Sequence, residues 1–356
     1  MAENERLREL LVELARRGAS DLLLVGGVEA SVRLNGEVEK IGDHPLTGAE
    51  IEELIEGVLS PVAAEQYRKT QIADSSYRAA GVGRFRINLH RERGQAAATI
   101  RALPVKVPAL EELGLPPEVS HLAGLRRGLV LVGGAAGAGK STTLAALVNE
   151  INKHDARHIL TIEDPVEYEH QHVRSVIEQV EVGTDAPDFP TALRAALRQA
   201  PDVLVVGEMR DPESMAIAVS AAETGHLVLS TLHTTDVASA VSRISDSFPA
   251  ERQNTIRQEL SMAISAIVSQ MLLPSRKGGR VPALEMLMVG YGARQHIRRN
   301  ALQHLHQEIT MTKGKGSITL EESLARLVRQ GHLEKDEAVE YAVHPDDLKS
   351  LLRLPG

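Results

Sequence analysis

Hydrophobic and polar residues recur with two different periods over the first hundred residues. Residues 1–17 place four leucines at helical spacing, which predicts an amphipathic helix. Asn35-Gly36 lies inside an alternating segment and predicts a β-hairpin. Thr47, followed three residues later by Glu50, predicts the capped start of a second helix.

Two further alternating segments, residues 84–89 and 96–103, predict another pair of strands. We therefore expect residues 1–103 to form a small α+β domain around a mainly antiparallel sheet. Prolines then recur at positions 104, 108, 116 and 117, and no helix can persist through them. Residues 104–122 are expected to be a linker or hinge.

From residue 128 the pattern changes to short apolar runs without alternation, as in strands that are buried on both faces of a parallel sheet. The predicted strands are residues 129–132, 158–162, 202–206 and 227–232. Helical segments separate several of them, so residues 123–290 are expected to be a doubly wound α/β core. After about residue 250 the pattern is almost wholly helical apart from a short run at 281–288, and residues 291–356 are assigned to a C-terminal helical region.

Composition narrows the possible functions. The 356 residues include 40 Lys and Arg against 48 Asp and Glu, a net charge of −8, and neither Cys nor Trp. Disulfides and thiolate metal sites are excluded, and the negative charge with few aromatic residues argues against a nucleic-acid partner. No apolar run approaches the ~20 residues of a membrane span, and the charged N-terminus does not look like a signal peptide. A cytoplasmic protein is expected.

The clearest chemical signal is a glycine-rich loop that follows one predicted strand and opens a helix. It matches the pattern G-x4-G-K-[ST], in which backbone amides and a helix N-terminus bind phosphate groups. Lys140 is expected to reach the β- and γ-phosphates of ATP, and the Ser141 hydroxyl to bind Mg²⁺. The predicted nucleotide-binding residues are Gly134, Ala135, Ala136, Gly137, Ala138, Gly139, Lys140, Ser141 and Thr142.

Two glutamates end predicted strands of the same sheet. Glu163 follows residues 158–162 and Glu208 follows residues 202–206, so both should lie at the edge that carries the glycine-rich loop. Glu208 is the predicted group that orients or deprotonates the attacking water. Since Gly207 stands where many nucleotide hydrolases carry a magnesium-linked Asp, Glu208 is expected to reach Mg²⁺ only through water. Glu163 is a second catalytic candidate, or else a structural ion-pair partner.

Histidines supply weaker signals. His226 and His233 flank the strand at 227–232 and are either γ-phosphate-site residues or hydrogen-bonded loop histidines. His296, His304 and His306 invite a metal hypothesis, which the lack of a cysteine or acidic partner at ligand spacing disfavours.

Taken together, the motifs resemble those of the secretion-type hexameric ATPases, and within them the type IV pilus retraction (twitching motility) ATPases. The segments that carry the resemblance are GLVLVGGAAGAGKSTTLAALVN for the phosphate loop, HILTIEDPVEY for the acidic "Asp box", PDVLVVGEMRDPES for the Walker B segment, AAETGHLVLSTLHTTD for the "His box" and GVGRFRINLHRERG for the arginine-bearing stretch.

The resemblance implies an ATP-hydrolysing homo-hexamer with a RecA-like core and a PAS-like N-terminal domain. It implies that Arg86 and Arg101, with Arg84 as a third, close over ATP, and that His226 and His233 serve the γ-phosphate site. The implied partner is an inner-membrane pilus platform protein, with a paralogous retraction ATPase as a further candidate. The implied location is peripheral, at the inner face of the cell membrane.

Alternatives remain open at this point. Residues 292–300 read GARQHIRRN, which departs from the motif of retraction ATPases. An accessory retraction, pilus extension or type II secretion ATPase would share the other motifs. A nucleotide-switched binding module with little turnover is the alternative of a different class.

Overall fold

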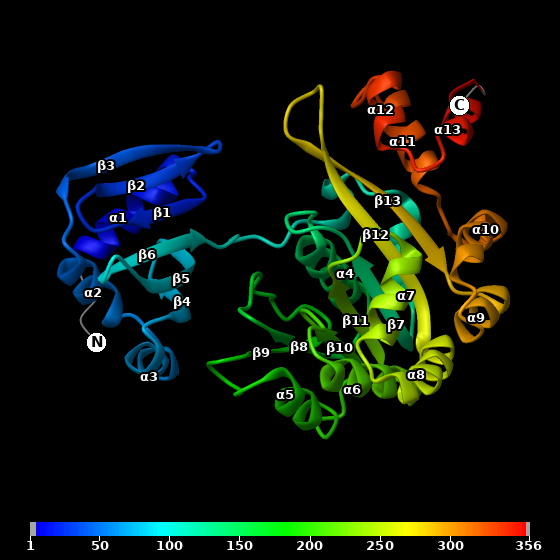
Figure 1. Ribbon diagram of the computed structural model, residues 1–356, viewed down its shortest axis with the longest axis horizontal. Coiled ribbons are helices and arrows are strands. Elements are labelled where there is room, and N and C mark those ends of the chain that lie inside the picture. The colour runs from blue at the N-terminus through cyan, green and yellow to red at the C-terminus, as the bar shows by residue number, and fades with distance from the viewer. Residues whose placement is uncertain (1–4, 354–356) are drawn as a thin grey trace. The chain divides into compact units, whose positions relative to one another are not determined.

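The computed structural model describes residues 5–353, and the chain divides into two compact units (Figure 1). Unit 1 holds the residues up to Lys106 together with Asp164–Glu169 and Glu181–Asp188. Unit 2 holds Val107–Glu163, His170–Val180 and the residues from Phe189 onward. The two short segments of unit 1 thus come from the part of the sequence whose pattern indicates the ATPase core.

Unit 1 is an α+β domain, as predicted, with a six-stranded sheet in the order β3-β2-β1-β6-β5-β4. Every neighbouring pair of strands is antiparallel. The elements are α1 (Glu5–Arg17), β1 (Asp21–Leu24), β2 (Glu29–Leu34), β3 (Glu37–Pro45), α2 (Gly48–Glu56), α3 (Pro61–Thr70), β4 (Ala73–Ala79), β5 (Gly83–Glu92) and β6 (Gln95–Ala102).

Local sequence signals explain several of these elements. Asn35 and Gly36 take φ values of 51° and 92° in the β2–β3 turn, the left-handed pair that a tight hairpin requires. Thr47 and Glu50 form both bonds of the predicted capping box. Predicted helix 1–17 is confirmed from Glu5, its first four residues lying outside the described part of the chain. The sequence pattern did not predict α3 or β4, although Ser60 caps α3.

The two faces of this sheet differ in kind. One face packs against the helices, and its core includes Leu11 from α1, Ile55 from α2 and Ile87 from β5. Since successive residues of a strand point to opposite faces, Arg84 and Arg86 lie on the other face.

Unit 2 is built on a seven-stranded sheet in the order β13-β12-β7-β11-β10-β8-β9. Strands β12, β7, β11, β10 and β8 run parallel, and β13 is antiparallel to β12. The strands are β7 (Gly128–Gly133), β8 (His158–Glu163), β9 (Val176–Glu181), β10 (Val203–Val206), β11 (Leu227–Leu232), β12 (Ile264–Pro274) and β13 (Arg280–Met288). The predicted RecA-like α/β core is confirmed.

Helices cover both faces of the parallel strands (Figure 1). Val130 and Val132 of β7 share a core with α4, so Leu129 and Leu131 point to the opposite face, toward α6. The helices are α4 (Lys140–His154), α5 (Phe189–Ala196), α6 (Pro212–Glu223), α7 (Val237–Asp246), α8 (Ala250–Ala263), α9 (Tyr291–Arg298), α10 (Leu305–Met311), α11 (Leu320–Arg329), α12 (Lys335–Tyr341) and α13 (Pro345–Arg353). Short 3₁₀ turns, Leu110–Leu113, Pro117–Gly124, Leu302–His304 and Lys313–Lys315, complete the unit.

One prediction about this unit is wrong. The region after residue 250 is not almost wholly helical, because β12 forms an 11-residue strand between β7 and β13. Its sequence, ISAIVSQMLLP, is apolar at both helical and alternating positions, and burial on both faces of the sheet decides the outcome. The C-terminal helices α11, α12 and α13 pack on the β12–β13 hairpin through one apolar cluster. Within residues 5–353, every helix is too short or too polar to cross a lipid bilayer.

Candidate functional site

The glycine-rich loop joins the end of β7 to the start of α4, as the sequence predicts. Gly134, Gly137 and Gly139 have φ values of 152°, 75° and 85°, which only glycine adopts without strain. A Cβ on Gly134 would lie 2.4 Å from the carbonyl oxygen of Gln270. The crest of the loop, Ala135–Gly137, is exposed, as a loop that binds phosphate through its backbone amides must be.

Lys140 is held over this loop. Its side chain is buried, and Nζ donates to the carbonyl oxygens of Gly134 and Ala135 at 2.9 Å each. Ser141 and Thr142 follow in the first turn of α4 and are partly buried. The ammonium group, the amides and the helix N-terminus together form a positive site for phosphates.

His233 lies between the lysine and the predicted catalytic glutamate. Its Nδ1 is 3.4 Å from Lys140 Nζ, and its Nε2 is 3.3 Å from Glu208 Oε1. Glu208 also accepts a 2.9 Å bond from Nε of Arg210. The structure therefore brings Lys140, His233 and Glu208 together at the carboxyl ends of β7, β10 and β11.

Glu163 lies beside this group, at the end of β8. Its Oε1 accepts from Thr161 Oγ1 at 2.7 Å and from Gln179 Nε2 at 3.3 Å. A Cβ on Gly207 would lie 3.2 Å from the carbonyl oxygen of Ile162 and 3.4 Å from Cα of Glu163. A side chain at position 207 would therefore press on the backbone of β8, which favours glycine before Glu208.

His226 lies just before β11, at the end of the sheet opposite the glycine-rich loop. Its ring Nδ1 is 3.0 Å from the Ala221 carbonyl oxygen, and its own carbonyl accepts from Gly128 N–H at the start of β7. The six-residue strand β11, about 20 Å long, separates it from the glycine-rich loop. Within one chain the structure does not bring His226 to the phosphate site.

Gln270 is a site residue that the sequence did not reveal. It projects from β12, where its Nε2 donates to the Ala138 carbonyl oxygen at 2.7 Å and its Oε1 accepts from Thr143 Oγ1 at 2.8 Å. The side chain thus fixes the loop and the first turn of α4 to the sheet. No motif marks Gln270, and the strand that carries it was not predicted.

The predicted arginines lie in unit 1, in a row of polar side chains across its sheet. Neighbours in this row are paired directly opposite one another in the order Arg33, Asp21, Arg101, Arg86 and Ser76. Like charges in such positions repel, so the Arg101–Arg86 pair requires nearby anions.

Asp21 and Asp74 supply part of that compensation. Arg101 Nε donates to Asp21 Oδ1 at 2.8 Å, and Arg86 Nη2 is 3.6 Å from Asp74 Oδ1. Burial opposes ionisation of Asp21, but hydrogen bonds from Ser20 and Arg101 and the charges of Arg101 and Arg33 outweigh it and lower the pKa of Asp21. The side chains of Arg86 and Arg101 remain 42% and 64% exposed, so both are accessible to a further anion.

Arg84 differs from the other two arginines. Its side chain is 13% exposed, and it donates to the Val166 carbonyl oxygen at 2.9 Å and contacts Glu181 at 3.4 Å and Glu169 at 3.2 Å. These acceptors belong to the two short segments of unit 1, so Arg84 anchors them to β5.

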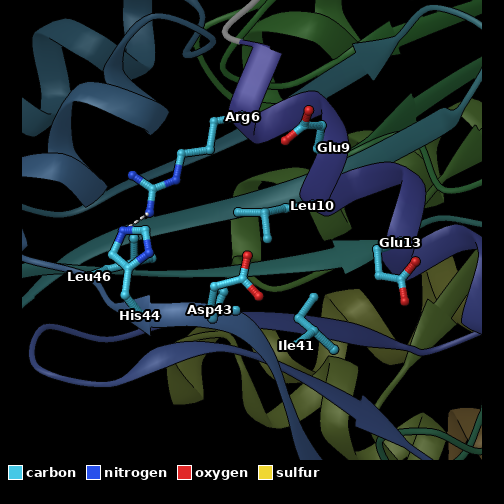
Figure 2. A pocket seen from close by; sticks show the side chains of 10 residues that line it. Arg6, Glu9, Leu10, Glu13, Ile41, Asp43, His44 and Leu46 are labelled. Atoms are coloured by element: carbon cyan, nitrogen blue, oxygen red, sulfur yellow. Dashed lines mark hydrogen bonds between the residues drawn. The ribbon is translucent and has the colours of Figure 1, made fainter.

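Unit 1 also contains a cavity of about 230 Å³ between α1 and β3, in which Arg6 contacts His44 at 2.8 Å (Figure 2). Carboxylates of Glu9, Glu13 and Asp43 line it. Glu13 is bound by Arg16 and Arg17 of its own helix. The cavity lies on the helix-covered side of the sheet and is separate from the arginine row.

The loop, Lys140 and the strand-end glutamates define a P-loop nucleoside triphosphatase with a RecA-like core. A family model described as Type II/IV secretion system protein matches residues 95–319. The chain belongs to this family and is an ATPase.

Similarity to individual proteins extends over nearly the whole chain. The type IV pilus retraction ATPase PilT of Pseudomonas aeruginosa is 39% identical over 341 residues, 96% of this chain and 99% of that protein. The type IV pilus ATPase PilU of the same organism is 37% identical over 353 residues, 99% of this chain and 92% of that protein. A crystal structure of the pilus retraction motor PilT with bound ADP has a TM-score of 0.87 at 40% identity, and the match covers 96% of this chain and 98% of that one.

Proposed function

We propose that this chain is the motor ATPase that retracts type IV pili, working as a homo-hexamer on a platform protein at the inner face of the cell membrane. The observation that carries the proposal is the similarity to a pilus retraction ATPase through both units, 96% of this chain and 99% of that protein. A match to the nucleotide-binding core alone would indicate only an ATPase.

In this proposal ATP is bound by residues 134–142. The amides of the exposed loop hold the β-phosphate, and Lys140 exchanges its two carbonyl contacts for the β- and γ-phosphates. The site offers oxygen donors of the kind that Mg²⁺ prefers: Ser141 would bind the ion directly and Glu208 through water. When bound, the ion neutralises charge that develops on the phosphates.

Hydrolysis is assigned to Glu208. The carboxylate orients the attacking water and accepts its proton, and His233 holds Glu208 and Lys140 in one hydrogen-bonded group near the γ-phosphate. Glu163 is held in place by Thr161 and Gln179, and it is the second carboxylate that we assign to the catalytic site. For His226 a role at the γ-phosphate stays a prediction that no contact within the chain supports.

Arg86 and Arg101 are assigned to the transition state. Two adjacent guanidinium groups on a rigid sheet match the charge that spreads over the γ-phosphate oxygens. Hydrolysis then depends on where unit 1 is placed, which is how a chemical step can drive a domain movement. Arg84 is assigned a positioning role. It holds residues 164–169 and 181–188 against β5, and through these segments it would affect the nucleotide site.

The proposal is tested by deleting the gene and complementing the deletion with wild type, Glu208→Gln or Glu178→Gln. Loss of a retraction motor leaves excess surface pili and no surface motility, which Glu208→Gln should fail to restore. Glu178 lies on β9 outside the loop site, and its matched charge change should restore both.

The purified proteins are then assayed for phosphate release at saturating ATP. Glu208→Gln should bind a fluorescent ATP analogue and release phosphate at least ~100-fold more slowly, the lower end of what general-base catalysis contributes. Ordinary turnover by Glu208→Gln would contradict the assignment of the catalytic glutamate. A deletion strain without any surface pili would indicate an extension ATPase instead.

The similarity to PilU favours one second candidate, an accessory ATPase that assists a separate retraction motor. In that case the deletion strain would keep retracting its pili, and a paralogue would co-purify with this chain.

A further inference from the structure

Three potential metal ligands from distant parts of the sequence meet at the C-terminal helices. His306 lies on α10, and His344 and Asp347 lie at the start of α13. One ligand atom from each of the three side chains lies within 4.8 Å of the other two. The two imidazole rings are 4.1 Å apart between centroids.

We propose that His306, His344 and Asp347 form a site for one divalent transition-metal ion of the Zn²⁺ class. Two imidazole nitrogens and one carboxylate oxygen are the donors of a tetrahedral zinc site whose fourth position holds water. Ligand atoms in such a site lie about 3.3 Å apart, so small side-chain rotations close it. Mg²⁺ does not fit, since it prefers six oxygen ligands.

The backbone holds two of the ligands in place. The N–H of His344 donates to Glu321 Oε1 at 2.8 Å, which ties the residue to α11. The N–H groups of Asp347 and Leu348 donate to the His344 carbonyl oxygen, at 3.1 Å and 3.2 Å. This turn places His344 and Asp347, three residues apart, on one side of the helix start.

The surroundings leave room for an ion to enter. His344 and Asp347 are exposed, and His306 is partly buried. A cavity of about 240 Å³ is lined by both histidines together with Glu285 and Glu321, and it gives space to water ligands. Of these two acidic neighbours, Glu321 adds negative potential around a cation.

The proposed site differs from the grouping of His296, His304 and His306 that the sequence analysis considered and disfavoured. His296 and His304 lie with ring centroids 5.1 Å apart, and His296 contacts Glu308 rather than His306. His306 instead faces a residue 38 positions later in the chain, a pairing that local spacing cannot reveal. A bound ion would fasten α13 to α10 and so stabilise the C-terminal helices.

The experiment uses the full chain, freed of metal by a chelator and kept without nucleotide. Zn²⁺ is titrated by calorimetry, and Co²⁺ by its visible absorption, which is intense only in tetrahedral sites. We expect one ion per chain, at least ~100-fold weaker binding in His306→Ala and His344→Ala, and at least ~10-fold weaker binding in Asp347→Asn.

His154→Ala is the matched control, because His154 is an exposed histidine of α4 outside the proposed site, with its Nε2 2.9 Å from Glu150 Oε1. It should bind Zn²⁺ as wild type does. Zn²⁺ should also raise the melting temperature of wild type and His154→Ala but not of the double variant of His306 and His344. Equal Zn²⁺ affinity in wild type, His306→Ala and His344→Ala, or no Zn²⁺ bound at one equivalent, would overturn the proposal.

Discussion

The two sheets of this protein place their charged side chains in different positions. The five parallel strands of unit 2 carry ionisable residues only at their ends, His158 and Glu163 on β8. In unit 1, Arg84, Arg86 and Arg101 lie inside strands β5 and β6.

The cause is the way each sheet is covered. Helices pack on both faces of the parallel strands, so a charge between the strand ends would be buried without water. Helices pack on one face of the antiparallel sheet, and the other face can carry a row of charges. The groups to which we assign catalysis in the core are therefore confined to the strand ends and the loops that follow them, whereas those assigned to unit 1 are spread over a surface.

The prediction with the largest expected effect asks whether the arginine row of unit 1 takes part in hydrolysis. Arg86→Ala and Arg101→Ala should each lower kcat about 10³-fold, as expected for arginines that stabilise charge on a transferring phosphoryl group. ATP affinity should change much less, because the loop of unit 2 supplies the binding contacts. Phosphate release and nucleotide titration measure the two quantities separately.

Arg33→Ala is the matched control for Arg101→Ala. Arg33 is paired opposite Asp21 on β2, just as Arg101 is on β6. If the arginine row acts only by stabilising the sheet, the two variants should lose similar activity. A normal kcat in both Arg86→Ala and Arg101→Ala would limit catalysis to unit 2.

The same contrast explains what could be predicted from sequence. Lys140 and Glu208 each follow a glycine within a motif, and Glu163 is the last residue of β8, so all three lie where a strand gives way to a turn. Alternation and caps also predicted the β2–β3 hairpin and α2 correctly. Arginines on a strand face have no such local mark, and only resemblance to a family singled out Arg86 and Arg101.

Gln270 illustrates the limit most clearly. Its strand is apolar at nearly every position, so periodicity does not separate strand from helix. Its role depends on contacts with Ala138 and Thr143, more than 120 residues earlier in the chain. Nothing in a local pattern carries that information.

A smaller effect is expected from Gln270→Leu. This change leaves the Ala138 carbonyl and the Thr143 hydroxyl without their partner, at about 1–3 kcal/mol for each group left unsatisfied. The loop should be held less firmly, and KM for ATP should rise about 10-fold while kcat changes little. Steady-state kinetics gives both values.

Val268→Ala separates positioning from general damage. Val268 lies on the same strand opposite Val132, and its apolar side chain belongs to the core and cannot form hydrogen bonds to the loop. It should lower the melting temperature by a comparable amount and leave KM unchanged. If both variants raise KM equally, Gln270 has no special role in holding the loop.

The smallest expected effect concerns Glu285, an acid in the middle of β13 in the sheet of unit 2. Burial, reinforced by the charges of Asp236 and Glu321, raises the pKa of Glu285 to about 7, against a hydrogen bond from Val237 N–H that lowers it. The comparison of the two sheets predicts this direction, since a carboxylate inside a covered sheet should hold its proton.

Because this pKa lies above the value in the unfolded chain, Glu285 contributes stability that is full below about pH 4.5 and is lost as pH rises through about 7. Glu285→Gln keeps the shape and the bond from Val237 but cannot ionise, so its urea midpoint should fall less than that of wild type between pH 5 and pH 8. The difference should correspond to at most about 3 kcal/mol. Glu340→Gln, which removes an exposed carboxylate from α12, should follow the wild-type curve. Parallel curves for wild type and Glu285→Gln would mean that Glu285 is ionised inside the sheet, and the contrast between the two sheets would then not rest on the cost of burying charge.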